Sequence, residues 1–332
     1  MRLSRFSLCL LLALLTAGYQ FWYVQNEYGG RYIDSEQVAR SQAVVDHTQA
    51  APYRYRLLSD SIFIHIYQQV IGSYALEWRG KHYVVTPAVL AAGLLRVIQN
   101  LLIFLLAGYF YLQLKLTPRQ VTGGLLLAAY AMCSALYQSD LGFSSYTEII
   151  CFLGAAIFVG GRRYLPFLAI TAIAALNRES SVLLPLLWLI HAVKLPKLRV
   201  KVNSWRDLWL AAGALALFVA IYAAIYWHVG SGPYSGSRYG KIHPGPLLLW
   251  LNLTNARTWF GLVVMAFPVA MLALLARSRK MPEWARIWAV VFVLPWTGAM
   301  LVCGSADETR LFLLPLILWA VPVTLLSLPR KT

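Results

Sequence analysis

Residues 164–193 read YLPFLAITAIAALNRESSVLLPLLWLIHAV, an apolar stretch interrupted at its middle by Asn-Arg-Glu-Ser at 177–180. As one tilted helix, it would place the basic cluster at 194–206 on the outer side of a membrane, against the rule that basic loops stay inside. We therefore expect two spans joined by a turn. Each has about 13 residues, fewer than the ~20 that cross a bilayer, so the turn should lie below the outer surface. Arg178 and Glu179 at that depth are site candidates.

The rest of the chain has the same apolar character. Of its 332 residues, 59% are hydrophobic and 13% charged, whereas soluble domains have ~25% charged residues. Apolar runs separated by short polar breaks predict an all-α polytopic membrane protein, with a single transmembrane domain over residues 1–332. The ten expected spans are 5–23, 86–112, 121–137, 146–161, 164–176, 181–193, 207–227, 258–276, 286–303 and 311–327.

Charges are sorted between the two sides of this predicted topology. With both chain ends cytoplasmic, every inner break is basic, and the net charge of +16 lies between spans. This arrangement gives no reason to expect a nucleic-acid partner. Of the thirteen carboxylates, only Asp207 and Glu283 fall inside, which leaves eleven outside. Acidic residues contribute little to orientation, so the bias points to chemistry at the outer surface, unless the inner loops are simply short and basic.

Two outer segments are long enough to build a site. The first, 24–85, includes residues 57–76, which are too polar to span and suit an interfacial or re-entrant helix. The second, 228–257, is rich in Gly, Pro, Ser and Tyr and is typical of a mobile loop. Its Arg238 and Lys241 could bind a saccharide or pyrophosphate, or belong to an ordinary connector.

The first outer segment combines acids with arginines. Asp34 and Glu36 are one residue apart, a short helix with alanines is expected to follow, and residues 51–56 (APYRYR) contain Arg54 and Arg56. A carboxylate can act as a general base on a sugar hydroxyl or hold a divalent metal, and an arginine can hold a phosphate bidentately. The alternative is a solvated loop.

Two further arginines need anionic partners. Arg310, in the run Asp-Glu-Thr-Arg at 307–310 before the last span, suits a clamp for a lipid phosphate or a salt-bridge cluster at the helix end. Arg96 shares a face of the second span with Asn100. For Arg96 we expect an interhelical bond to Glu148 or to a backbone carbonyl rather than contact with a ligand.

The layout resembles that of the polyprenyl-phosphate-dependent glycosyltransferases of the GT-C fold. The shared features are a first span, an outer aspartate, an alanine-bearing helix, a Pro-Tyr-Arg-Tyr-Arg stretch, an interfacial helix and many further spans. Only residues 30–60 resemble a family motif. The resemblance implies a bacterial inner (plasma) membrane enzyme that moves a sugar from a polyprenyl-phosphate donor to a glycan, lipid or protein acceptor at the outer, periplasmic face. It implies no nucleotide and no cofactor, while the lack of a clear double-acid pair leaves metal dependence open.

By position in this resemblance, Asp34 corresponds to the catalytic base and Glu36 to a possible second acid. The residues expected at the lipid-phosphate or substrate site are Arg54, Arg56, Arg178, Glu179, Arg238, Lys241 and Arg310. The mechanism requires Asp34, Arg178 and Arg310 to meet in one outer-facing cavity.

Two other functions fit the same sequence. A saccharide polymerase or ligase acting on lipid-linked glycans would depend on the basic loop at 228–257. A transporter or flippase would use a buried translocation site, formed by Arg96, Glu148, Arg178 and Glu179. No inverted repeat is visible in the sequence.

Overall fold

The computed structural model describes residues 4–29, 32–49, 53–70, 74–78, 81–136, 142–195, 201–230, 244–275, 281–304 and 308–328. Within these ranges the chain is helical apart from two two-stranded hairpins. Seven of the described helices or helical runs are long and apolar enough to cross a bilayer. These are α1 (Arg5–Tyr28), α4 (Pro87–Gln113), α6 (Phe143–Gly160), α9 (Trp205–Val229), α11 (Ala256–Leu275), Glu283–Cys303 and Thr309–Ser327. The chain is therefore a multi-pass membrane protein.

Two of the seven are composite. Glu283–Cys303 consists of α12 (Glu283–Trp288), η5 (Ala289–Val293) and α13 (Leu294–Cys303). Thr309–Ser327 consists of η6 (Thr309–Phe312), α14 (Leu313–Pro315), η7 (Leu316–Ala320) and α15 (Val321–Ser327).

The other three predicted spans also coincide with helices. They are α5 (Pro118–Ser134), α7 (Tyr164–Ala175) and the run of η3 (Glu179–Trp188) into α8 (Leu189–Ala192). Local signals explain several starts: Thr86 and Thr117 cap α4 and α5, each with a proline at the first helical position. Gln120 completes a capping box with Thr117.

The break predicted in the middle of 164–193 is present. After α7 ends, Arg178 adopts an extended conformation (φ −163°, ψ 142°) before η3 begins. The Leu176 carbonyl at the end of α7 accepts a hydrogen bond of 3.1 Å from the Leu58 backbone N–H. A segment from the first loop thus satisfies a backbone group that the break leaves without an intrahelical partner.

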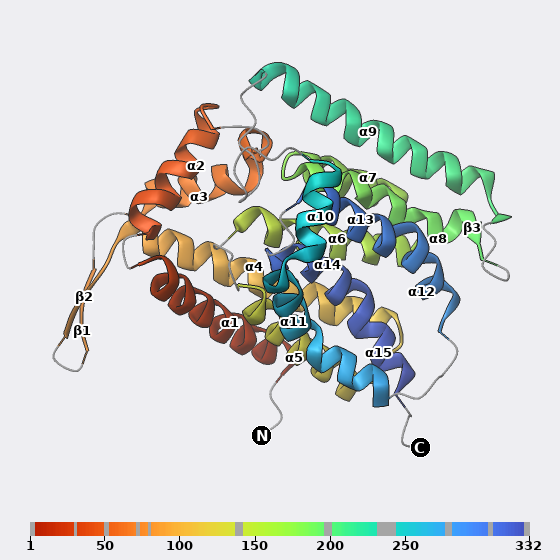
Figure 1. Ribbon diagram of the computed structural model, residues 1–332, viewed down its shortest axis with the longest axis horizontal. Coiled ribbons are helices and arrows are strands. Elements are labelled where there is room, and N and C mark those ends of the chain that lie inside the picture. Colours follow the sequence, from red (N-terminus) through yellow and green to blue (C-terminus); the bar gives the residue numbers. More distant parts are fainter. Residues whose placement is uncertain are drawn as a thin grey trace.

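The described part of the first predicted outer segment forms η1 (Ile33–Gln37), α2 (Val38–Val45), η2 (Tyr53–Tyr55), α3 (Leu57–Gln69), and the antiparallel strands β1 (Tyr74–Trp78) and β2 (Lys81–Val85). The helix expected over 57–76 therefore ends at Gln69, and a hairpin follows. The second predicted loop differs too, because α10 (Pro246–Thr254) is helical. Figure 1 shows α2 and α3 together near the start of α4.

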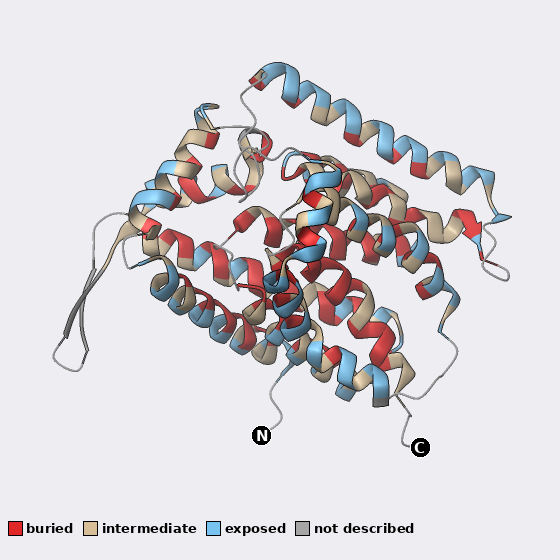
Figure 2. Cartoon of the chain, in the orientation of Figure 1, coloured by how far each residue is buried: buried red, intermediate tan, exposed pale blue. Residues whose placement is uncertain are grey.

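Burial separates central from peripheral helices. The most apolar window of Thr309–Ser327 is 78% buried, whereas that of α9 is 22% buried. Figure 2 shows the same contrast, with α9 mostly exposed and α6 mostly buried. Large apolar side chains such as Trp209 and Trp227 are exposed on α9. An apolar exterior of this kind suits a lipid environment.

Helix ends gather at two places. At one, which we call the Arg310 end, a cavity is lined by residues of η1, α2, α3, the start of α6, and η6. At the other, the Arg162 end, the α6–α7 turn meets α12 and the hairpin of β3 (Val193–Lys194) and β4 (Lys201–Val202). The predicted topology puts these two groups of loops on opposite sides of the membrane.

Candidate functional site

The cavity at the Arg310 end draws its residues from segments far apart in the sequence. Its lining consists of Gln37, Arg40, Val44, Tyr53, Arg56, Asp60, Gly142, Phe143, Ser144 and Arg310. Among these described residues, three are arginines and one is an aspartate. Several guanidinium groups around one cavity suit an anion with multiple oxygen acceptors, such as a phosphate.

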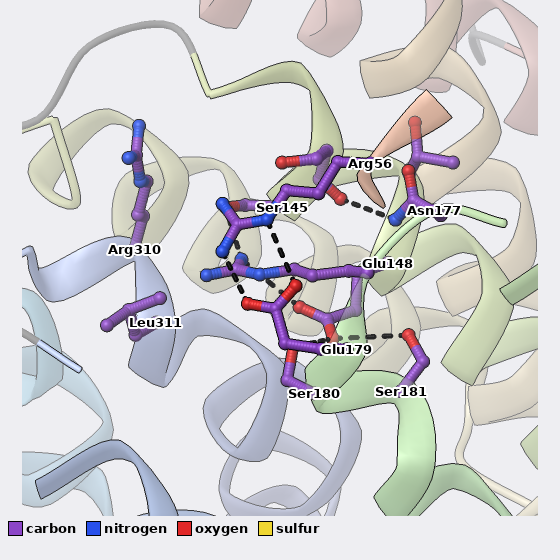
Figure 3. A network of polar contacts seen from close by, with 12 residues as sticks. Arg56, Ser145, Glu148, Asn177, Glu179, Ser180, Ser181, Arg310 and Leu311 are labelled. Atoms are coloured by element: carbon purple, nitrogen blue, oxygen red, sulfur yellow. Dashed lines mark hydrogen bonds and ion pairs between the residues drawn. The ribbon is translucent and has the colours of Figure 1, made fainter. Parts of the chain in front are cut away.

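Arg56 lies in the cavity wall as one half of an ion pair. It lies between η2 and α3 and is buried, and its guanidinium makes a bidentate pair with Glu179 (Nε to Oε2, 3.1 Å; Nη2 to Oε1, 2.5 Å). Its Cζ lies 4.5 Å from the centre of the Tyr53 ring. Burial disfavours the charge, but the Glu179 carboxylate outweighs burial and holds the pKa of Arg56 above its ordinary value. Figure 3 shows the pair of Arg56 and Glu179.

Arg310 depends on a glycine. Its buried side chain donates from Nη2 to Oε2 of Glu308 over 2.8 Å. Gly142, just before α6, has φ +48°, and a Cβ there would overlap Arg310 Nη1 and lie 2.8 Å from its Cζ. Only glycine gives this guanidinium its present place beside the backbone.

The Asn-Arg-Glu-Ser turn beside the cavity is tied to α6. Arg178 Nη1 donates to Ser145 Oγ (2.7 Å) and to Glu148 Oε2 (3.3 Å). Glu148 Oε1 accepts from Ser180 Oγ (2.5 Å) and Ser181 Oγ (3.3 Å). Arg178 and Glu148 are both buried, and Figure 3 shows Glu148 beside Ser180 and Ser181 of the turn. The charge of Arg178 is therefore paired with a carboxylate inside the protein.

A second set of bonds joins the turn to α3. Ser59 Oγ donates to Asn177 Oδ1 over 2.6 Å and lies 2.8 Å from Thr147 Oγ1. Asn177 Nδ2 donates to the Ser144 carbonyl over 2.8 Å. Ser59 and Asn177 are fully buried. These bonds fix α3, α6 and the turn relative to one another beside the cavity.

The two predicted acids, Asp34 and Glu36, both belong to η1. Asp34, in η1, accepts a hydrogen bond from Thr86 Oγ1 at the start of α4, and Glu36 is exposed. Neither is among the residues that line the cavity. The carboxylate that does line it is Asp60 on α3, which accepts from Ser41 Oγ over 2.6 Å. We did not predict Asp60 as a site residue, although it is the one carboxylate on α3.

Of the predicted phosphate-binding residues, Arg56 and Arg310 line the cavity, and Glu179 is the partner of Arg56. Arg178 does not line it. Arg238 and Lys241 lie outside the described residues, and so does the side chain of Arg54. Within the described ranges, no three His, Cys, Asp or Glu side chains form a group that could hold a metal ion.

Arg96, for which we expected Glu148 or a backbone carbonyl as the partner, contacts two aromatic rings. Its guanidinium lies over the ring of Tyr146, 3.7 Å from the centroid, and 5.2 Å from that of Phe143. Glu148 pairs with Arg178 instead. The cation that pairs with Glu148 comes from the turn, which the sequence alone does not place beside α6.

Comparison with protein-family models, with curated proteins and with solved structures finds no match. Fold and cavity together therefore define a class only: a helical, multi-pass membrane protein with an arginine-lined cavity where loops meet.

Proposed function

We propose that this protein is a membrane glycosyltransferase that moves a sugar from a polyprenyl-phosphate donor to an acceptor hydroxyl at the Arg310 end. The observation that carries the proposal is the shared cavity of Arg40, Arg56, Arg310 and Asp60. It combines cations for a phosphate with a carboxylate for a proton. The resemblance in layout to GT-C enzymes supplies the donor class.

The arginines would act on the leaving group. When the bond between the sugar's anomeric carbon and the phosphate oxygen breaks, negative charge grows on that oxygen. Arg56, already held by Glu179, and Arg310, which would turn from Glu308 to the phosphate, stabilise this charge. The polyprenyl phosphate leaves with the bonding electron pair.

A carboxylate would take the proton that the acceptor hydroxyl loses as its oxygen bonds to the anomeric carbon. Asp60 is the candidate that lines the cavity, and Asp34 is the candidate implied by the resemblance. Glu36 remains a possible second acid. The products are the glycosylated acceptor and polyprenyl phosphate.

The proposal includes a topology of ten spans in a bacterial inner membrane, with both chain ends cytoplasmic and the Arg310 end outside. Two observations support it: each predicted span coincides with a helix or helical run, and the helix ends gather into two groups. The basic residues at the Arg162 end favour the cytoplasm for that end.

The test is sugar transfer in proteoliposomes, with polyprenyl-phosphate sugars and a panel of acceptors, with Mg²⁺ or with EDTA. We expect a glycosylated product from the wild type. Arg310→Gln should lower the rate by about 10²–10³-fold, and substitution of the base by about 10²–10⁴-fold. Asp60→Asn and Asp34→Asn, compared directly, identify that base. Arg163→Gln, an exposed residue at the Arg162 end, is the control.

Two results would contradict the proposal. Exchange of substrate across the membrane without product, unaffected by either aspartate variant, would indicate a transporter. Loss of activity on substituting Arg238 and Lys241, with Arg310 variants fully active, would indicate a polymerase or ligase instead.

A further inference from the structure

A second cavity lies at the Arg162 end. It encloses about 740 Å³, including its open mouth, and is lined by Arg162, Ile190, His191, Val193, Lys194, Asn203, Glu283, Trp284 and Ile287. The α6–α7 turn, α8, the hairpin, the start of α9 and α12 contribute to it. Val193 and Ile287 are buried, whereas the charged residues and Asn203 are exposed. The cavity therefore combines apolar walls with a polar, mainly cationic rim.

The two cations of this rim lack the carboxylate partners that the arginines at the Arg310 end have. Arg56, Arg178 and Arg310 each pair with a glutamate at the Arg310 end. Arg162 and Lys194 form no ion pair with any residue that the structure describes. Basic loops on this side follow from membrane insertion, but insertion does not require two of their cations to line one cavity.

The hairpin adds a third cation beside Lys194. In the β3–β4 register, Lys194 lies directly opposite Lys201. Like charges in facing positions destabilise a strand pair. Arg162 itself has φ +52°, a left-handed conformation that costs a residue with a side chain about 1 kcal/mol or more. A bound anion beside the two lysines would offset their repulsion.

We propose that this cavity binds the phosphate headgroup of an anionic phospholipid. Arg162 and Lys194 would pair with the phosphate, and the Asn203 amide would donate to one of its oxygens. The apolar walls favour a lipid over a free phosphate, because Ile190 and Ile287 offer a surface for the start of an acyl chain. Trp284 belongs to the residue type that gathers at headgroup level. Basic pockets between spanning helices are known to suit such headgroups.

The experiment compares two double variants that remove the same charge. Arg162→Gln with Lys194→Gln alters the rim of the cavity. Arg163→Gln with Arg286→Gln removes two exposed cations of the same end that do not line it. All four side chains are exposed, so neither variant should disturb folding. Native mass spectrometry of protein exchanged into mixed phosphatidylglycerol and phosphatidylcholine nanodiscs measures which lipid is retained.

We expect the wild type to retain phosphatidylglycerol in preference to phosphatidylcholine. Each basic residue beside an anionic headgroup contributes about fivefold in affinity, so the rim variant should lose about 25-fold of this preference. The matched variant should keep it. Equal retention of both lipids by the wild type would overturn the proposal, and so would equal losses in the two variants.

A further arm separates the lipid from a soluble ligand. Glycerol phosphate added to detergent-solubilised protein should raise the melting temperature far less than phosphatidylglycerol does. Stabilisation by glycerol phosphate alone would assign the cavity to a soluble phosphate compound and refute a lipid site. None of these measurements depends on the sugar-transfer reaction.

Discussion

Gly142→Ala tests whether a single missing methyl group positions Arg310. The φ of +48° costs alanine about 1 kcal/mol, which should appear as a lower free energy of unfolding. The new Cβ would lie 2.8 Å from Arg310 Cζ, where ordinary contacts begin at 3.4 Å. The guanidinium must therefore retreat by more than half an ångström. One charged hydrogen bond to a phosphate, about 1.5–3 kcal/mol, would be lost, and polyprenyl phosphate should bind about 10- to 100-fold more weakly.

The matched control is Gly123→Ala. Gly123 lies inside α5, and a Cβ there meets nothing within 4 Å. The same chemical change should therefore stabilise the protein by about 0.5–1 kcal/mol, because alanine favours a helix more than glycine does. Chemical unfolding in detergent measures stability, and thermophoresis with labelled polyprenyl phosphate measures affinity. If Gly142→Ala matches Gly123→Ala in both, the glycine does not position Arg310.

The ion pair and the hydrogen bonds around the turn give further predictions. Arg56→Leu should lower the free energy of unfolding by about 2 kcal/mol, a figure reduced because the Glu179 side chain is 32% exposed. The double variant with Glu179→Leu should lose less stability than the two single variants lose together. Strict additivity would refute the coupling. The raised pKa of Arg56 means that its pair with Glu179 stabilises the fold at every pH below the ordinary pKa of arginine. The loss on Arg56→Leu should therefore be equal at about pH 7 and about pH 9. Ser59→Ala should cost about 1–3 kcal/mol, because it leaves Asn177 Oδ1 buried without its donor. Ser7→Ala, at a half-buried serine whose hydroxyl bonds to the exposed Ser4, should change little, and equal effects of the two substitutions would contradict this reasoning.

The helices could be predicted from the sequence because a bilayer imposes a local length on each apolar run. The break at 177–180 was predictable for the same reason, since only two short helices keep the following basic cluster inside. The helix at 246–254 was not predicted, because the glycines and prolines around it are typical of a loop. Pro246 after Gly245, followed by an apolar run, is a helix-start signal that could have identified it.

The composition of the cavity could not be predicted in this way. Asp34 and Asp60 belong to the same loop and have the same chemistry, and nothing local distinguishes them. Asp60 lines the cavity because α3 packs where α6 and η6 also end, whereas Asp34 bonds to Thr86 at the start of α4. Such convergence depends on contacts between segments far apart in the chain. The like-charged lysines of the hairpin likewise become visible only once strand register is known.

The bond between Leu58 N–H and the Leu176 carbonyl constrains the order of assembly. During synthesis, the segment around α3 is made long before α7, and it has to wait for the end of α7 to arrive. Neither α7 nor η3 is long enough to be stable across a bilayer alone. In the proposed ten-span topology, we therefore expect this pair to settle after its neighbours are in place, so that the cavity is completed after the individual helices have been inserted.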